Sequence, residues 1–169
     1  GDKVEACVKK KRKGRFEAEV TSYLELGIER QAPPCQHFGV CGGCRWQDLG
    51  YKDQLQIKEK MVLEVLKEKG FQVLEIKPIL ESPNSLFYRN KMEFSFGLDH
   101  QGSLQLGLHM RGRYNRLFDV VSCCLQSELS NHILRTVRQY ANRAGLSVYD
   151  LKKHEGLLRF LVVREGKKS

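Results

Sequence analysis

Three of the six cysteines lie within ten residues of one another and could bind a metal together. These are Cys35, Cys41 and Cys44, and two glycines separate the last two thiols. Glycine leaves the backbone free to curl, so neighbouring sulfur atoms can point to one centre. Soft thiolate ligands favour zinc, copper(I) or an iron–sulfur cluster. A cubane cluster needs four protein ligands, and Cys123 or Cys124 is available as the fourth.

Other interpretations of the same residues remain open. Zinc accepts Cys35, His37, Cys41 and Cys44 as a ligand set, and all four lie in one segment. A Cys41–Cys44 pair also matches the C-x-x-C pattern of redox disulfides. Buried cysteines can instead act as small apolar side chains without any site. The spacing favours a metal site but does not choose between a cluster and zinc.

The chain is basic and shows no sign of export or membrane insertion. Its 169 residues include 29 Lys and Arg against 20 Asp and Glu, a net charge of +9, and 41% are hydrophobic. No apolar run reaches the length of a membrane span, and the N-terminus has no signal pattern. Six cysteines in such a chain indicate a reducing compartment, so we expect a cytoplasmic protein without a membrane partner. The positive charge favours a nucleic-acid partner.

Hydrophobic periodicity predicts an α+β fold. Two alternating runs, 4–8 and 16–26, flank a basic turn and predict a hairpin, which needs further strands before Gly1 because a lone hairpin is marginal. Helices are expected over 51–69, ending at Gly70, and over 128–144, between an N-cap at Ser127 and Gly145. Strands are expected over 71–80, 87–98, 104–110, 117–121 and 157–163, with a short one near Val148. The expected apolar stripes are Tyr51, Leu55, Val62, Val65 and Leu66 in the first helix, and Leu129, Ile133, Val137, Tyr140 or Ala141, and Ala144 in the second.

Three groups of cationic residues are candidates for contacts with RNA, the third being Arg111, Arg113 and Arg116 around Tyr114, for which a charged solvent loop is the alternative. Phosphate attraction predicts a salt-sensitive contact at the basic turn, although a solvated turn is the alternative. Tyr88, Arg89 and Lys91 combine an aromatic ring with two cations, which suits base stacking and phosphate binding, although Tyr88 could equally be a core residue. Arg111, Arg113 and Arg116 are expected in a loop. The residues of the basic turn are Lys9, Lys10, Lys11, Arg12, Lys13 and Arg15.

Several of these motifs together match a known family. They are the segment Cys35-x5-Cys41-Gly42-Gly43-Cys44, the run Phe87-Tyr88-Arg89-Asn90-Lys91, the pattern Asp119-Val120-x-x-Cys123, and the run 157–164. In this combination the chain resembles the 23S ribosomal RNA uracil-5-methyltransferase family. Its opening residues, with the basic turn, resemble the back half of that family's TRAM domain, a small OB-like RNA-binding barrel. The resemblance spans nearly the whole chain.

The resemblance implies a 4Fe-4S cluster held by Cys35, Cys41, Cys44 and Cys123. The family usually has a single cysteine at the last of these positions, whereas Cys124 follows here. The Asp-Val-x-x-Cys register selects Cys123. Because successive strand residues face opposite ways, one of the two should reach the cluster.

The resemblance also implies an activity and a division of the chain. Family members methylate carbon 5 of uracil with S-adenosylmethionine, after a cysteine thiolate adds to carbon 6. We find no motif for that cysteine or for the methyl donor here, so no residue is expected to be catalytic and the catalytic domain is expected beyond Ser169. The expected parts are residues 1–31, the C-terminal half of a partial OB-like barrel; 32–50, the cluster-binding loop; and 51–169, a small antiparallel-sheet domain with two helices.

The expected partner is RNA, ribosomal first and transfer RNA as the alternative, bound by a monomer. A zinc-binding, non-enzymatic nucleic-acid module is the competing function. A ferredoxin-like electron carrier is disfavoured, because this chain is basic. The colour of anaerobically purified protein separates these classes, since iron–sulfur proteins are brown and a zinc protein is colourless.

Overall fold

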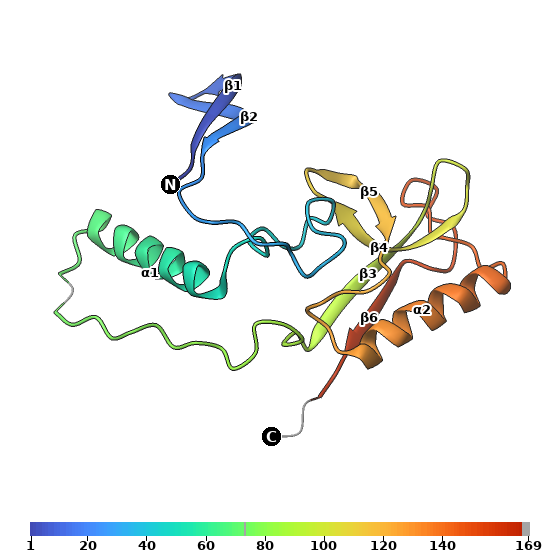
Figure 1. Ribbon diagram of the computed structural model, residues 1–169. Helices are drawn as coiled ribbons and strands as arrows, with labels where there is room; N and C mark the ends of the chain where they lie inside the picture. The colour runs from blue at the N-terminus through green and yellow to red at the C-terminus, as the bar shows by residue number, and fades with distance from the viewer. Residues whose placement is uncertain (73, 167–169) are drawn as a thin grey trace. The chain divides into compact units, whose positions relative to one another are not determined.

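The computed structural model describes residues 1–72 and 74–166. Contacts within this part define two units, residues 1–33 with 46–81, and residues 34–45 with those from 82 onward. Helices and antiparallel strands both occur, so the predicted α+β class is confirmed. No helix in the described ranges is long and apolar enough to cross a membrane. The elements are β1 (Lys3–Arg12), β2 (Arg15–Glu25), α1 (Tyr51–Glu68), β3 (Lys91–Leu98), β4 (Leu104–Met110), β5 (Arg113–Asp119), α2 (Glu128–Arg143) and β6 (Phe160–Arg164) (Figure 1).

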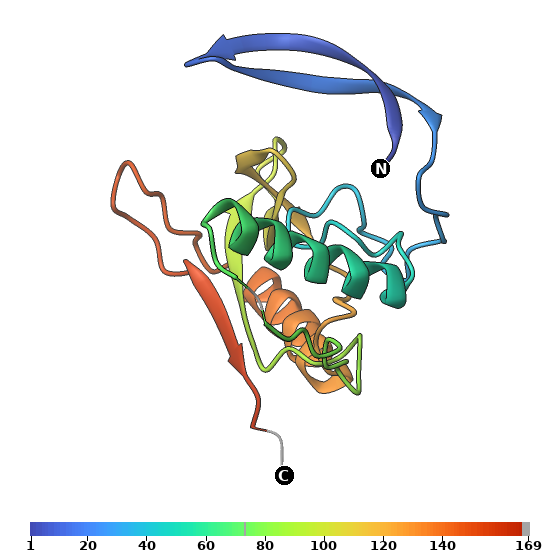
Figure 2. The same cartoon turned by 90° about the vertical axis from the view of Figure 1, so that its left-hand side faces the viewer.

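Strands β1 and β2 form the predicted hairpin, a long curved ribbon in Figure 2. Its turn consists of Lys13 and Gly14, both with positive φ (46° and 76°), so two residues in the left-handed region reverse the chain. Such two-residue turns match the twist of the flanking strands. Most of the basic residues therefore lie in β1, and not in the turn. Among the described residues no other strand pairs with this sheet, and the OB-like barrel stays a prediction.

Helix α1 occupies the predicted range and ends as predicted. Gly70 has a φ of 76° and its N–H donates to the carbonyl of Lys67 (3.0 Å). The expected apolar stripe is only partly buried: Leu55 is buried and Tyr51 and Leu66 are half-buried, while Val62 and Val65 are 59% and 56% exposed. The helix period was therefore correct, but it did not show which stripe residues are covered.

The strand predicted over 71–80 is wrong for the residues that the structure describes, and Val73 lies outside them. Leu74 and Leu80 are 98% and 93% exposed, and no strand is available to pair with this run. Pro78 also removes a backbone donor that a ladder would use. A short alternating pattern does not form a strand when no partner supplies the hydrogen bonds.

The second unit is built on an antiparallel sheet with the strand order β5-β4-β3-β6. Helix α2 packs against one face of this sheet, as Figure 1 shows. Strand β4 has its predicted bounds. β3 begins at Lys91, later than predicted, because Phe87 adopts a positive φ of 55°. The buried apolar core of this unit consists of Met92, Phe94, Phe96, Leu106, Val120, Cys123, Leu125, Leu134, Ala141 and Val163.

Helix α2 has its predicted N-cap but not all of its predicted buried face. The Ser127 hydroxyl accepts a hydrogen bond from the N–H of Ser130 (3.1 Å). Leu134 and Ala141 are buried, whereas Leu129 and Tyr140 of the expected stripe are 61% and 66% exposed. The buried face thus includes two polar residues at the start of the helix, Ser130, whose hydroxyl donates to Glu165 (3.2 Å), and Asn131, which bonds to the backbone of Cys123.

Two further predictions on the strands need correction. Arg113 and Arg116 lie in β5 and not in a loop, because Gly112, with a φ of 71°, turns the chain directly from β4 into β5. The strand near Val148 is reduced to an isolated bridge with Leu158.

Candidate metal centre

The cysteine loop, residues 35–44, is fixed by its own hydrogen bonds and by the end of β4. The carbonyl of His37 accepts from the N–H of Cys41 (2.8 Å), which closes a tight turn. Cys41 forms an antiparallel bridge with Met110 of β4. The N–H of Gly42 donates to the carbonyl of His109 (3.1 Å), so this part of the loop is hydrogen-bonded to the end of β4.

The loop glycines serve different purposes. Gly39 has a φ of 88°, a conformation that side chains disfavour. Gly42 is needed for close approach, because a Cβ there would lie 3.2 Å from the carbonyl oxygen of His109. The N–H of Gly43 points at the Sγ of Cys41 (3.4 Å). The glycines, which the sequence suggested would leave the backbone free to curl, therefore form one defined turn around Cys41.

Cys123 is held in place by a buried asparagine of α2. The side-chain oxygen of Asn131 accepts from the N–H of Cys123 (2.8 Å), and its amide donates to the carbonyl of Cys123 (3.2 Å). Asn131 is 2% exposed, so these bonds are shielded from water. This pairing explains why α2 presents a polar residue to the interior. No pattern in the sequence marked Asn131 as part of the site.

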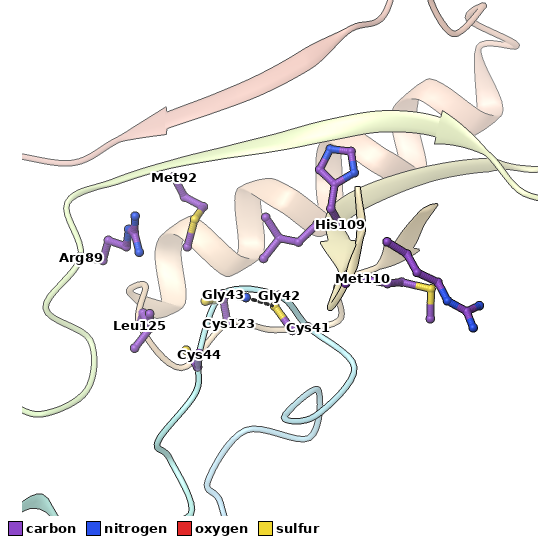
Figure 3. A pocket seen from close by; sticks show the side chains of 13 residues that line it. Cys41, Gly42, Gly43, Cys44, Arg89, Met92, His109, Met110, Cys123 and Leu125 are labelled. Carbon is purple, nitrogen blue, oxygen red and sulfur yellow. Dashed lines mark hydrogen bonds between the residues drawn. The ribbon is translucent and has the colours of Figure 1, made fainter. Parts of the chain in front are cut away.

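A cavity of about 620 Å³ brings thiols from both segments together (Figure 3). Cys41 and Cys44 from the loop line it, and so does Cys123. Arg89 and Arg113 line the same cavity. Soft sulfur ligands around one space match the donor sets of zinc and of an iron–sulfur cluster.

Cys124 is not among the residues that line the cavity, and neither it nor Cys123 lies in a strand. Its thiol donates to the carbonyl of Pro34 (3.5 Å) and also hydrogen-bonds the side chain of Cys35. Cys35 follows that proline and does not line the cavity either. It lies close enough to interact electrostatically with Cys41 and Cys123. The structure therefore brings the four predicted ligands and Cys124 into one region, and Cys123 is the one of the adjacent pair that lines the cavity.

Burial raises the pKa of the Cys123 thiol, and the neighbouring cysteines raise it further. The pKa of Cys41 is raised by burial as well, and the N–H of Gly43 partly opposes this shift. A cation among these sulfur atoms would favour their ionised forms, which are the forms that bind metal. In the described part of the chain all six cysteines are free thiols, so the Cys41–Cys44 disulfide is not formed in this structure.

No group of three or more His, Cys, Asp or Glu side chains within the described residues converges tightly enough to hold a single metal ion. A tetrahedral zinc site needs each sulfur at about 2.3 Å from one centre. A cubane cluster takes each thiolate on a different iron and so accepts a wider set of sulfur positions.

His37 connects the loop to the segment that carries Cys123. Its Nε2 accepts from the N–H of Val121 (3.1 Å), and its ring packs against Phe118 with centroids 5.2 Å apart. Partial burial lowers the pKa of this imidazole, which favours the neutral form that accepts the bond. Since Nε2 is engaged by the backbone, His37 positions the loop against the Cys123 segment, and Nδ1 is the nitrogen that the zinc interpretation would use.

The structure separates the residues proposed for RNA into three environments. Tyr88 is 49% exposed and Lys91 is exposed at the start of β3. Arg89 lies at the cavity instead, because its N–H donates to the carbonyl of Leu125 (2.8 Å) and ties this segment to the site. We name the remaining group the basic strip. It consists of the exposed hairpin residues Lys9, Lys10, Lys11, Arg12, Lys13 and Arg15.

Comparison with known proteins identifies relatives along the whole chain. A protein from Caldanaerobacter subterraneus subsp. tengcongensis that is named as an RNA methyltransferase is 41% identical over 169 residues, which are 100% of this chain and 38% of that protein. Another, from Bacteroides thetaiotaomicron, is 37% identical over 97% of this chain and 39% of its own length. The chain thus spans less than two fifths of these relatives. No family model matches it.

A solved structure is also similar. It is the crystal structure of the Pyrococcus abyssi tRNA (uracil-54, C5)-methyltransferase in complex with S-adenosyl-L-homocysteine. The TM-score is 0.62 at 25% sequence identity, over 97% of this chain and 36% of that one.

Proposed function

We propose that this chain belongs to the same family as these RNA methyltransferases and is the RNA-binding, 4Fe-4S-carrying part of an RNA (uracil-5-)-methyltransferase. Less than two fifths of the relatives' length corresponds to this chain. We therefore assign binding of S-adenosylmethionine and methyl transfer to other residues of the protein, and catalytic chemistry to none of the present ones.

The convergence of Cys41, Cys44 and Cys123 on one cavity carries the proposal. Two of these thiols come from the loop and one from a segment that follows β5. Cys35 completes a set of four thiolates, the number that a cubane cluster requires. Bound there, the cluster would join the two segments through iron–thiolate bonds.

The surrounding residues have identifiable tasks in this arrangement. Asn131 fixes the backbone of Cys123, and His37 fixes that of Val121. Arg89 and Arg113 offset the negative charge that four thiolates concentrate in the cavity. Such supporting partners tune a metal site as well as orienting its ligands.

RNA is the partner that the family and the charge support. The basic strip supplies phosphate contacts, which position RNA without reading its sequence. The motifs around the cysteines resemble the ribosomal enzymes, so we propose 23S ribosomal RNA as the substrate. Transfer RNA is the alternative, since the solved relative acts on tRNA. A cytoplasmic monomer fits this role.

Metal analysis of anaerobically purified protein tests the cluster. We expect about four iron and four labile sulfide per chain, one iron for each thiolate ligand. Cys7→Ser is the matched control, because Cys7 is an exposed thiol of β1 outside the site. One zinc per chain without iron would replace this proposal with the zinc-binding module.

Activity is tested separately with the whole protein. Incubation with S-adenosylmethionine and 23S ribosomal RNA should yield 5-methyluridine. Methylation of transfer RNA alone would reassign the substrate without affecting the cluster.

A further inference from the structure

One face of the β5-β4-β3-β6 sheet is covered by α2, and the opposite face is exposed near β3 and β6. Phe160 and Val162 of β6 are 47% and 45% exposed there. Alternation along the strands places every second residue on this side. We name this surface the open face and define it by Lys91, Glu93 and Ser95 of β3 and Phe160, Val162 and Arg164 of β6.

The charges of the open face favour an anionic partner. Lys91 lies directly opposite Arg164 in the β3–β6 ladder, and like charges opposite each other destabilise a sheet. Among the described residues neither side chain forms an ion pair, and Arg159 adds a third cation just before β6. Glu93 is the acidic residue of this face. A polyanion would relieve the repulsion between Lys91 and Arg164.

An exposed stacking surface lies at the other end of the same strand. The guanidinium of Arg159 is 5.1 Å from the centre of the Phe160 ring and 5.4 Å from that of Tyr149. The cation is thus held between two rings, while half of the Phe160 side chain faces solvent. Aromatic rings and guanidinium planes are the surfaces on which proteins stack unpaired bases.

The spacing of these features suits a short stretch of single-stranded RNA. Arg164 is the fourth residue after Phe160 along the strand, which places the two residues about 13 Å apart. Beside Phe160 the face is shallow, because Phe160 is paired with the small Ser95, and between Phe160 and Arg164 lies Val162, which is paired with Glu93. Small side chains let a nucleic-acid backbone approach the sheet.

We propose that the open face binds single-stranded RNA, with a base stacked on Phe160 and Arg159 and phosphates contacted by Lys91 and Arg164. This inference rests on the proposed function, since it assigns a contact surface to the RNA of that enzyme. It adds three residues that the sequence did not single out for RNA, Arg159, Phe160 and Arg164. A protein partner fits less well, because the paired cations lie at one end of the exposed apolar residues.

Titration of an unstructured RNA oligonucleotide that carries 2-aminopurine tests the stacking. Phe160→Ala should weaken binding roughly 5- to 150-fold, the range for loss of one base–aromatic stack, with little change in salt dependence. Phe160→Tyr keeps a ring and should restore both the affinity and the quenching of 2-aminopurine. Iron content and thermal unfolding would show that the variants are folded.

The phosphate contacts are tested with the double variant Lys91→Gln, Arg164→Gln. Its slope of log affinity against log salt should flatten by about 1.4, the value for two lost contacts with a single strand. Lys153→Gln removes an exposed cation outside the open face and is the control.

Unchanged affinity in both open-face variants, with wild-type RNA binding intact, would overturn the inference and leave the proposed function standing. No RNA binding by the wild-type protein would remove both, and a change of oligomeric state in Phe160→Ala would assign the face to a protein contact instead.

Discussion

The two sheets of this chain are stabilised in different ways. In the β1–β2 hairpin the apolar side chains face solvent, and Val8, Phe16 and Tyr23 are 57%, 63% and 60% exposed. In the sheet of the second unit the corresponding side chains are enclosed, and Phe94 and Leu106 are fully buried. The hairpin therefore depends on its turn and its cross-strand pairs, whereas the larger sheet depends on a core.

This difference relates each sheet to a separate task. The thiols are attached to the sheet with a core, where positions are fixed by packing and a metal site needs that accuracy. The basic strip lies on a hairpin that is marginal without further contacts. Its exposed apolar residues are available for the rest of a barrel, and its cations are available for RNA.

The largest effect is expected at the ligand that belongs to the core. Cys123→Ser should abolish the cluster, because the loop alone supplies three thiolates. Cys124→Ser should retain it, because Cys123 lines the cavity and Cys124 does not. Iron and sulfide content after anaerobic purification is the measurement. Loss of iron in Cys124→Ser with retention in Cys123→Ser would reverse the ligand assignment.

The second prediction compares the loss of stability when one phenylalanine in each sheet is replaced by alanine. Phe94→Ala should lower the free energy of unfolding by about 3–5 kcal/mol, because it leaves a cavity in a closed core. Phe16→Ala should cost less than about 1 kcal/mol, since its ring is 63% exposed and loses little burial. Denaturant unfolding followed by circular dichroism measures both. Equal costs would mean that the hairpin is packed in solution and that the contrast between the sheets is wrong.

The smallest effect on the fold, and a specific effect on binding, is expected from the basic strip. Neutralising Lys9, Lys10, Lys11, Arg12 and Lys13 should leave stability almost unchanged. The slope of log affinity against log salt should flatten by roughly 3.5 at most, at 0.7 per lost phosphate contact. RNA titrations at several salt concentrations check this. A slope equal to that of the wild type would show that the strip is a solvated surface.

Strong local signals predicted most of the elements. The two helices and β4 were placed to within one residue, because a 3.6-residue period and a cap are both local in sequence. The run 71–80 failed for a non-local reason, since its alternation says nothing about whether a partner strand exists. The buried face of α2 was partly missed for a similar reason. Asn131 is buried because it serves the backbone of Cys123, and periodicity treats asparagine as a surface residue.

For the candidate site as well, local signals could be read from the sequence and contacts between distant segments could not. Spacing indicated the loop cysteines, whereas the alternation expected of Cys123 and Cys124 does not apply, because β5 ends at Asp119 and neither cysteine lies in a strand. The place of Arg89 at the cavity follows from a backbone bond to Leu125, a pairing between distant segments without a local signature. The role of His37 depends likewise on Val121, which is 84 residues away.

That separation along the chain has a consequence for how the protein is made. The segments that carry the thiols lie 84 to 90 residues apart, as the bonds of His37 to Val121 and of Cys124 to Pro34 show. At roughly 5–20 residues per second, the first three thiols leave the ribosome several seconds before the fourth. During this interval they are exposed to oxidants and to competing metals. Delivery of a complete cluster must therefore wait until translation has passed α2, whose Asn131 fixes the last ligand.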